Sequence, residues 1–199
     1  MSQIVEKMRR EIMERSDRFE EQTKRTKDEY NIYREHIQYV YKYVVLLSKY
    51  KNVDKEVLEL SALLHDISMT DMTLDRSRHN EFGADIAERL LRENDYPEDK
   101  VQLVKKCILN HSKSRSDYRT TEEERILVDA DGLSHFDAIE KLYSLPSMVM
   151  GLSEEDSVYF VQDKLTADYD ELSDDLKYLV KDKYDMVMAA KCAEEIKAL

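Results

Sequence analysis

The sequence contains little glycine or proline, with three and two of these residues among 199. Hairpins and β-sandwiches need many tight turns, and glycine and proline supply the backbone conformations of such turns. Leucine, glutamate, lysine, methionine and alanine, which favour helices, are abundant instead. The composition therefore predicts an all-α fold, and the length is that of one domain with room for a small helical annex.

The two cysteines, Cys107 and Cys192, form no CxxC or other paired pattern. A disulfide framework is therefore not expected. No apolar run approaches the roughly eighteen residues of a membrane-spanning helix. The first ten residues are charged and lack the apolar core of a signal peptide. We therefore expect a cytoplasmic protein without a membrane partner.

Basic residues are outnumbered by acidic ones, which gives a formal net charge of −12. A surface of this sign repels the phosphate backbone, whose neutralisation supplies most non-specific affinity for nucleic acids. The charge balance therefore argues against a polymeric nucleic-acid partner.

The chain is predicted to have three parts. Residues 1–30 are dense in charge, with eight acidic and eight basic residues and a thin apolar stripe, which is typical of a largely solvated helix. Residues 31–145 carry longer apolar stripes and form the expected core. Residues 146–199 read as amphipathic helices of an acidic annex packed on that core, because the chain beyond Gly151 has thirteen acidic and six basic residues. An amphipathic annex of this kind also suits a homodimer.

Histidine and aspartate interrupt the most apolar predicted helices. His36 continues an apolar face by helical spacing, His65 and Asp66 follow an apolar run, and Asp129 and Asp131 lie inside another. A buried carboxylate is costly unless it is paired, and a divalent cation is a sufficient partner. One such histidine is more often a hydrogen-bonded core residue, and one such aspartate is usually capped or paired with arginine. The metal hypothesis therefore depends on the whole set occurring on successive helices.

Two polar loops add further histidines and a group of cations. His79 opens the helix after the first loop, and His111 ends the inner face of the helix that follows Pro97. Basic residues flank both histidines: Arg76, Arg78, Lys113, Arg115 and Arg119. In an acidic protein such a group would attract an anionic substrate, although the alternative that these side chains are simply solvated stays open.

The ordered set of His36, then His65-Asp66, then Asp131 resembles the HD superfamily of metal-dependent phosphohydrolases. The resemblance covers roughly residues 35–142, and more loosely the annex around residues 160–165. The stretches that carry it are Ala62-Leu63-Leu64-His65-Asp66-Ile67, His79 with Gly83-Ala84, Ile108-Leu109-Asn110-His111-Ser112, and Leu127-Val128-Asp129-Ala130-Asp131-Gly132-Leu133. The resemblance implies an all-α HD-domain bundle, here with the charged N-terminal helix and the C-terminal annex added.

The resemblance also implies a site. A divalent cation (Mn, Fe, Co, Ni, Zn or Mg) would be held by His36, His65, Asp66 and Asp131, since mixed nitrogen and oxygen ligation does not select one metal. Asp66 would orient the attacking water, and Asp129 or Asp71 would move its proton. His79 and His111 match the places where some relatives bind a second metal, or they meet a phosphate of the substrate, while His135 is expected to be structural.

The implied activity is hydrolysis of a small phosphorylated substrate, such as a nucleotide or a related phosphate ester. Many members follow His-Asp with Ile-Gly and a lysine, but this chain has Ile67-Ser68-Met69, which removes one phosphate-facing cation. Arg76, Arg78, Lys113 and Arg115 are expected to replace it. Two alternatives stay open: a non-catalytic HD-type regulatory or ligand-binding module, and a helical interaction protein whose histidines are structural.

Overall fold

The computed structural model describes residues 2–23 and 31–199, with the side chains of 23 and 145–150 left out. Within these residues every regular element is a helix, which confirms the predicted all-α class. The α-helices are α1 (Gln3–Thr23), α2 (Gln38–Leu47), α3 (Lys55–Leu64), α4 (His79–Arg92), α5 (Glu98–Asn110), α6 (Glu122–Asp137), α7 (Ile139–Met150), α8 (Glu154–Glu171), α9 (Lys181–Ala189) and α10 (Ala193–Lys197). A π-helix, η1 (Tyr33–Ile37), leads directly into α2, and 3₁₀ turns η2 (Ile67–Thr70), η3 (Arg76–Arg78), η4 (Lys113–Tyr118) and η5 (Lys177–Leu179) lie between later helices.

Local capping explains where several of these helices begin. The Asp54 side chain accepts hydrogen bonds from two backbone N–H groups of the first turn of α3. The predicted capping box of Thr121 and Glu124 is confirmed at the start of α6. Pro97 stands immediately before α5, with a φ of −55°. These caps fix the ends of the helices that carry the histidines and aspartates.

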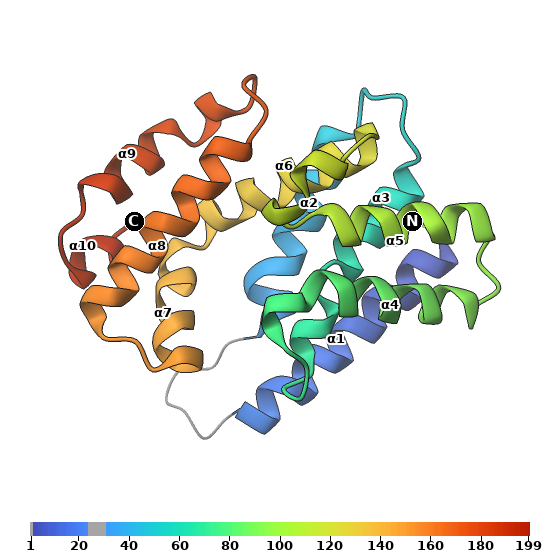
Figure 1. Cartoon of the computed structure of the whole chain (residues 1–199), viewed down its shortest axis with the longest axis horizontal. Helices are drawn as coiled ribbons and strands as arrows, with labels where there is room; N and C mark the ends of the chain where they lie inside the picture. The colour runs from blue at the N-terminus through green and yellow to red at the C-terminus, as the bar shows by residue number, and fades with distance from the viewer. Residues whose placement is uncertain (1, 24–30) are drawn as a thin grey trace.

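The main core surrounds α3, whose Val57, Leu60, Leu63 and Leu64 are inaccessible to solvent. This observation confirms the prediction that the apolar segment before His65 is central. The inner face of α1 belongs to the same core, because Val5, Met8 and Ile12 are buried against it. In Figure 1, α1 to α6 gather on one side of the molecule and α7 to α10 on the other.

A second core joins the annex helices to α6. Leu133 and Phe136 of α6 pack with Val158, Val161 and Leu165 of α8, so one helix contributes to both halves of the molecule (Figure 1). None of the helices in the described ranges is long and apolar enough to cross a membrane.

The C-terminal part of the annex, after α8, is not one continuous helix. It is divided into η5, α9 and α10. The division after α9 has a hydrogen-bonding cause, because the Gln162 amide on α8 donates to the carbonyl oxygens of Val187 and Ala190. In a continuing helix, these carbonyl oxygens would accept hydrogen bonds from backbone N–H groups of the next turn. Here the Gln162 side chain donates to them instead.

Candidate metal centre

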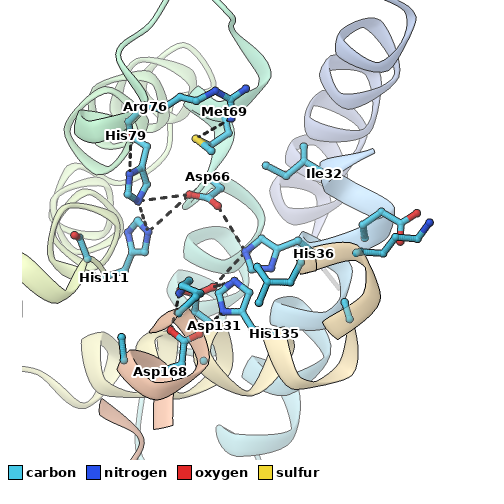
Figure 2. A pocket seen from close by; sticks show the side chains of 18 of the residues that line it. Ile32, His36, Asp66, Met69, Arg76, His79, His111, Asp131, His135 and Asp168 are labelled. Atoms are coloured by element: carbon cyan, nitrogen blue, oxygen red, sulfur yellow. Dashed lines mark hydrogen bonds and ion pairs between the residues drawn. The ribbon is translucent and has the colours of Figure 1, made fainter. Parts of the chain in front are cut away.

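Imidazoles and carboxylates from separate helices converge where several helix ends meet (Figure 2). The contributing positions are η1, the end of α3, the start of α4, the end of α5 and the middle of α6. The side chains are His36, His65, Asp66, His79, His111 and Asp131. Helix ends are suitable places for such residues, because a polar side chain there leaves the apolar stripe of the helix intact.

The first group contains His36, His65 and Asp131. The Nε2 atoms of His36 and His65 lie 3.0 Å apart. Asp131 Oδ1 lies 3.2 Å from the first of these nitrogens and 3.7 Å from the second. Asp66 Oδ2 is 3.6 Å from both. The structure therefore brings the four predicted ligands together around one point.

The second group contains His79, His111 and the other oxygen of Asp66. The Nε2 atoms of the two histidines lie 3.2 Å apart. Asp66 Oδ1 lies 3.9 Å from His79 Nε2 and 3.8 Å from His111 Nε2. The Asp66 carboxylate therefore stands between the two pairs of histidines and turns one oxygen to each.

Hydrogen bonds on the far side of the rings fix how three of the imidazoles point. The Nδ1 atoms of His65, His79 and His111 contact backbone carbonyl oxygens three residues earlier in the chain, at 2.9, 3.1 and 2.6 Å. Those carbonyls belong to Ala62, Arg76 and Ile108. A carbonyl only accepts, so each Nδ1 carries the proton and each Nε2 of a neutral ring keeps its lone pair.

A serine side chain fixes the same tautomer of His36, with the proton on Nδ1. Its Nδ1 lies 3.1 Å from Ser134 Oγ, and that hydroxyl donates to the backbone oxygen of Asp131 at 2.7 Å. Since the serine proton is used, Ser134 accepts from His36 Nδ1–H. The lone pair on His36 Nε2 then faces that of His65, which is repulsive unless a cation lies between them.

Two further observations agree with a bound cation. Asp66 Oδ1 and Asp131 Oδ1 are buried, and neither accepts a hydrogen bond from any described residue. Buried carboxylate oxygens normally have such a partner. Two ligands that each lie about 2.1 Å from one ion are separated by roughly 3 to 3.4 Å, close to the spacings of the first group. The residues present therefore fit a divalent metal.

The surroundings also favour the protonation states that a metal requires. Burial would raise the pKa of Asp66, but the surrounding imidazoles, His65 first, outweigh burial and hold that pKa below its ordinary value. Asp131 is likewise buried, and His135 and His36 hold its pKa well below the ordinary range. Burial lowers the pKa of His111 to about 4. Charged carboxylates and neutral imidazoles are the forms that bind metal.

Comparison with known proteins places this arrangement in a family. Residues 33–135, slightly more than half of the sequence, match the HD domain. The chain belongs to the HD domain family. The crystal structure of a predicted HD superfamily hydrolase from an uncultured Thermotogales bacterium resembles it with a TM-score of 0.50 and 22% identity, covering 90% of this chain and 91% of the other. That likeness concerns the fold. No curated protein matches the sequence.

The family match contains every histidine and aspartate of the two groups. HD domains bind divalent metals, and the two groups provide places for one. Together, the family and the groups support a metal-dependent hydrolase.

A cavity of about 1080 Å³ opens over the metal centre of this HD domain. The end of α1, the core helices and the annex all contribute to its wall. Of the five basic loop residues, Arg76 and Lys113 line it. The expected group of cations is therefore only partly present.

The other three basic residues are directed elsewhere. Arg78 is exposed and pairs with Glu81, and Arg115 lies over the ring of Tyr118. Arg119 is buried, pairs with Glu171 and donates to backbone oxygens at the end of α5. None of the three lines the cavity. Local partners hold each of them, so Arg78 and Arg115 are not placed to bind substrate as expected.

Asp129 lies away from the metal centre. Its carboxylate accepts from the backbone N–H of Ser173 at 2.8 Å and from the Ser173 hydroxyl at 2.7 Å. Two residues correspond to about 200° around an α-helix, so Asp129 and Asp131 face nearly opposite directions. The structure therefore assigns Asp129 to fixing the chain after α8, and it does not place this carboxylate where it can move a proton of the attacking water.

The wall residues that were not predicted as part of the site include His135, Lys164 and Asp168. His135 stacks on His36 with ring centroids 4.8 Å apart and an interplanar angle of 7°. Lys164 and Asp168 come from α8 in the annex. The i, i+4 spacing of the last two is a weak sequence signal that many surface ion pairs share. Nothing in the sequence pattern indicated that this face of α8 meets α6 at Asp131.

Proposed function

We propose that this HD domain is a divalent-metal-dependent phosphohydrolase that acts on a small phosphorylated substrate, such as a nucleotide or a related phosphate ester. The observation that carries the proposal is the convergence of four imidazole Nε2 atoms with free lone pairs on two carboxylates, each of which has one buried oxygen that accepts no hydrogen bond from the described residues. This centre lies beneath a cavity that is large enough for a nucleotide, since ligand sites commonly measure about 300 to 1000 Å³.

His36, His65, Asp66 and Asp131 would hold the metal. When bound, a divalent cation acidifies a water molecule and polarises the phosphoryl oxygen that gains charge during hydrolysis. Asp66 would fix the position of the attacking water, because its two oxygens face the two histidine pairs. His79 and His111, with Asp66 Oδ1, would bind either a second cation or a phosphate of the substrate.

Other residues of the wall would bind and orient the substrate. Arg76 and Lys113 would contact its phosphate, as cations commonly do. Apolar side chains from three parts of the chain, Phe19, Ile32 and Phe160, line the cavity and would contact the remainder of the substrate. Because α1 and α8 form parts of the wall, the bound phosphate would be partly withdrawn from bulk water, which strengthens these electrostatic contacts.

A screen for phosphate release tests the proposal. Nucleotides and generic phosphate mono- and diesters are each incubated with the protein and Mn²⁺, Co²⁺, Ni²⁺ or Mg²⁺, with His65→Ala as the matched control. We expect turnover with at least one metal in the wild type and none in the variant. No turnover with any combination, in protein that binds metal, would favour a non-catalytic HD module. Protein that binds no metal would favour a helical interaction protein.

A further inference from the structure

The annex contributes an unassigned chain of polar contacts to the wall of the cavity. Lys164 Nζ lies 2.6 Å from Asp168 Oδ1, and the other oxygen of Asp168 lies 3.0 Å from His135 Nδ1. The opposite nitrogen of His135 is 4.0 Å from Asp131 Oδ1. The contacts therefore connect α8 to the metal centre, although α8 lies outside the residues that match the family.

The Lys164 ammonium has N–H donors that the described residues do not use. An ammonium group has three N–H donors, and Asp168 is the one acceptor that the described residues place within reach of Nζ. The side chain is 35% exposed, and it lines the cavity. Burial lowers the pKa of Lys164, but Asp168 and then Asp131 outweigh burial and raise that pKa, so the group stays cationic. Two donors of a partly desolvated cation are therefore available to a ligand.

The position of this cation differs from that of Arg76. In Figure 2, Arg76 and Asp168 lie on opposite sides of the cluster formed by His36, Asp66 and Asp131. Arg76 contacts Met69 Sδ at 3.8 Å and lies over the ring of Phe19. Lys164, held by Asp168, thus supplies positive charge on the side of the metal centre opposite Arg76.

We propose that Lys164 binds a phosphate oxygen of the substrate from the annex side of the cavity, and that Asp168 is a positioning residue that holds the Lys164 ammonium there. This inference rests on the proposed function. Cations on two sides of the centre suit a substrate with more than one phosphate group, such as a diphosphate.

An ion pair that only secures helix α8 is the structural alternative, and the chain contains a matched control for it. Lys181 and Asp185 form an i, i+4 ion pair on α9 of the same annex, and neither residue lines the cavity. Removing the Lys181 charge should reproduce any general effect of losing an annex ion pair. It should leave ligand binding unchanged.

The test measures binding of methylenediphosphonate, a non-hydrolysable diphosphate, to Mn²⁺-loaded full-length protein by calorimetry. Wild type, Lys164→Met and Lys181→Met are compared, with the Mn²⁺ content of each determined beforehand. Loss of a hydrogen-bonded charge contact should weaken binding about tenfold or more in Lys164→Met. Lys181→Met should bind like the wild type. Lys164→Gln, which keeps a donor for Asp168 but lacks the charge, repeats the test if the methionine variant does not fold.

Three results would overturn the inference: unchanged binding in Lys164→Met, equal weakening in Lys181→Met, or loss of Mn²⁺ together with loss of binding. A wild type that neither binds the diphosphonate nor releases phosphate from any ester would contradict the proposed function instead, so the two failures are distinguishable.

The role of Asp168 has its own readout. With p-nitrophenyl phosphate or bis(p-nitrophenyl) phosphate as substrate, Asp168→Asn should raise KM several-fold and change kcat less, because the displaced ammonium affects substrate binding first. Asp168→Glu keeps the charge and should restore most of the affinity for methylenediphosphonate. A fall in kcat alone, or no rescue of diphosphonate binding by Asp168→Glu, would contradict a positioning role.

Discussion

Ser134 Oγ lies 3.1 Å from His36 Nδ1, although 98 residues separate the two in the sequence. The same hydroxyl donates to the carbonyl oxygen of Asp131 in the preceding turn. One serine therefore fixes the proton on the far side of His36 and joins the π-helix η1 to α6. Hydrogen bonds of this kind orient metal-binding imidazoles and raise their basicity.

Removing this hydroxyl should weaken metal binding without unfolding the protein. Outer hydrogen bonds to metal ligands contribute roughly 10- to 100-fold in affinity, so Ser134→Ala should raise the Kd for Mn²⁺ within that range. Ser61→Ala is the control, because Ser61 is also buried and its hydroxyl donates to the backbone oxygen of Val57 in its own helix. Equal Kd values for Ser134→Ala and wild type would contradict the orienting role.

The cations near the core loops should divide by whether they line the cavity. Lys113→Ala should raise KM for a phosphorylated substrate, because a ground-state phosphate contact is largely shared with the transition state. Arg78→Ala should leave KM and kcat unchanged, because Arg78 pairs with Glu81 on the surface. Steady-state kinetics on both variants distinguish these outcomes. A larger rise in KM for Arg78→Ala than for Lys113→Ala would show that the surface pairing of Arg78 with Glu81 does not persist.

Two glycines should respond in opposite ways to the same substitution. A Cβ on Gly83 of α4 would lie 2.9 Å from the backbone oxygen of His65, which is closer than two such atoms can approach unless the backbone shifts. A Cβ on Gly132 of α6 would instead meet side-chain atoms of Leu172 and Asp168 at ordinary van der Waals distances. Gly83→Ala should lower the free energy of unfolding by about 1 to 3 kcal/mol. Gly132→Ala should be neutral or stabilising by up to about 1 kcal/mol, through helix propensity.

Urea titrations of the metal-free proteins, with chelator present, measure these two free energies separately from any change in metal affinity. A Gly83→Ala protein as stable as the wild type would mean that α4 does not press on the turn that carries His65 and Asp66.

Glu124 should make stability depend on pH. Burial alone would raise the pKa of this carboxyl, but hydrogen bonds from Asn110, Thr120 and Thr121 hold it below its ordinary value. A lowered pKa in the folded state means that the carboxylate contributes stability above the unfolded pKa of about 4.3 and loses that contribution as the pH falls through the folded pKa.

Glu124→Gln should therefore lower the free energy of unfolding by about 1.5 to 3 kcal/mol at pH 7, the range for hydrogen bonds to charged groups, and by less as the pH falls below 4. Denaturant titrations at pH 7 and pH 3.5 measure the difference. The exposed Glu155 is the control, and its replacement by glutamine should have little effect at either pH. A difference between Glu124→Gln and wild type that stays constant with pH would contradict the argument.

The sequence predicted the helical class because helix formers and capping residues act locally, and the capping box at Thr121 appears where it was expected. The ordered set of His36, His65-Asp66 and Asp131 was singled out through its resemblance to the HD superfamily, and the structure brings these four residues together. Asp129 was assigned to the site because spacing along an apolar run does not tell which of two nearby acids faces inward. The Ser173 N–H that binds Asp129 lies 44 residues away.

Contacts that the sequence pattern does not show also explain why the other predicted site residues differ from those in the structure. Arg78, Arg115 and Arg119 were grouped by proximity to histidines, but other partners turn them aside. Arg78 and Arg115 contact residues three positions later, whereas Arg119 pairs with Glu171, 52 residues away. Lys164 and Asp168 were missed for the opposite reason. Their place in the site depends on where α8 packs against α6, which is set by contacts of the second core between residues far apart in the sequence.

The most direct test of the metal centre compares wild type with Asp66→Ala for bound metal, by elemental analysis after Mn²⁺ loading and dialysis, and for phosphate release. Asp66 is the carboxylate that both histidine pairs face. The variant should fold, because the buried charge and its cation are removed together. It should lose bound Mn²⁺ and all turnover. An Asp66→Ala protein that retains the metal content and phosphate release of the wild type would contradict the account.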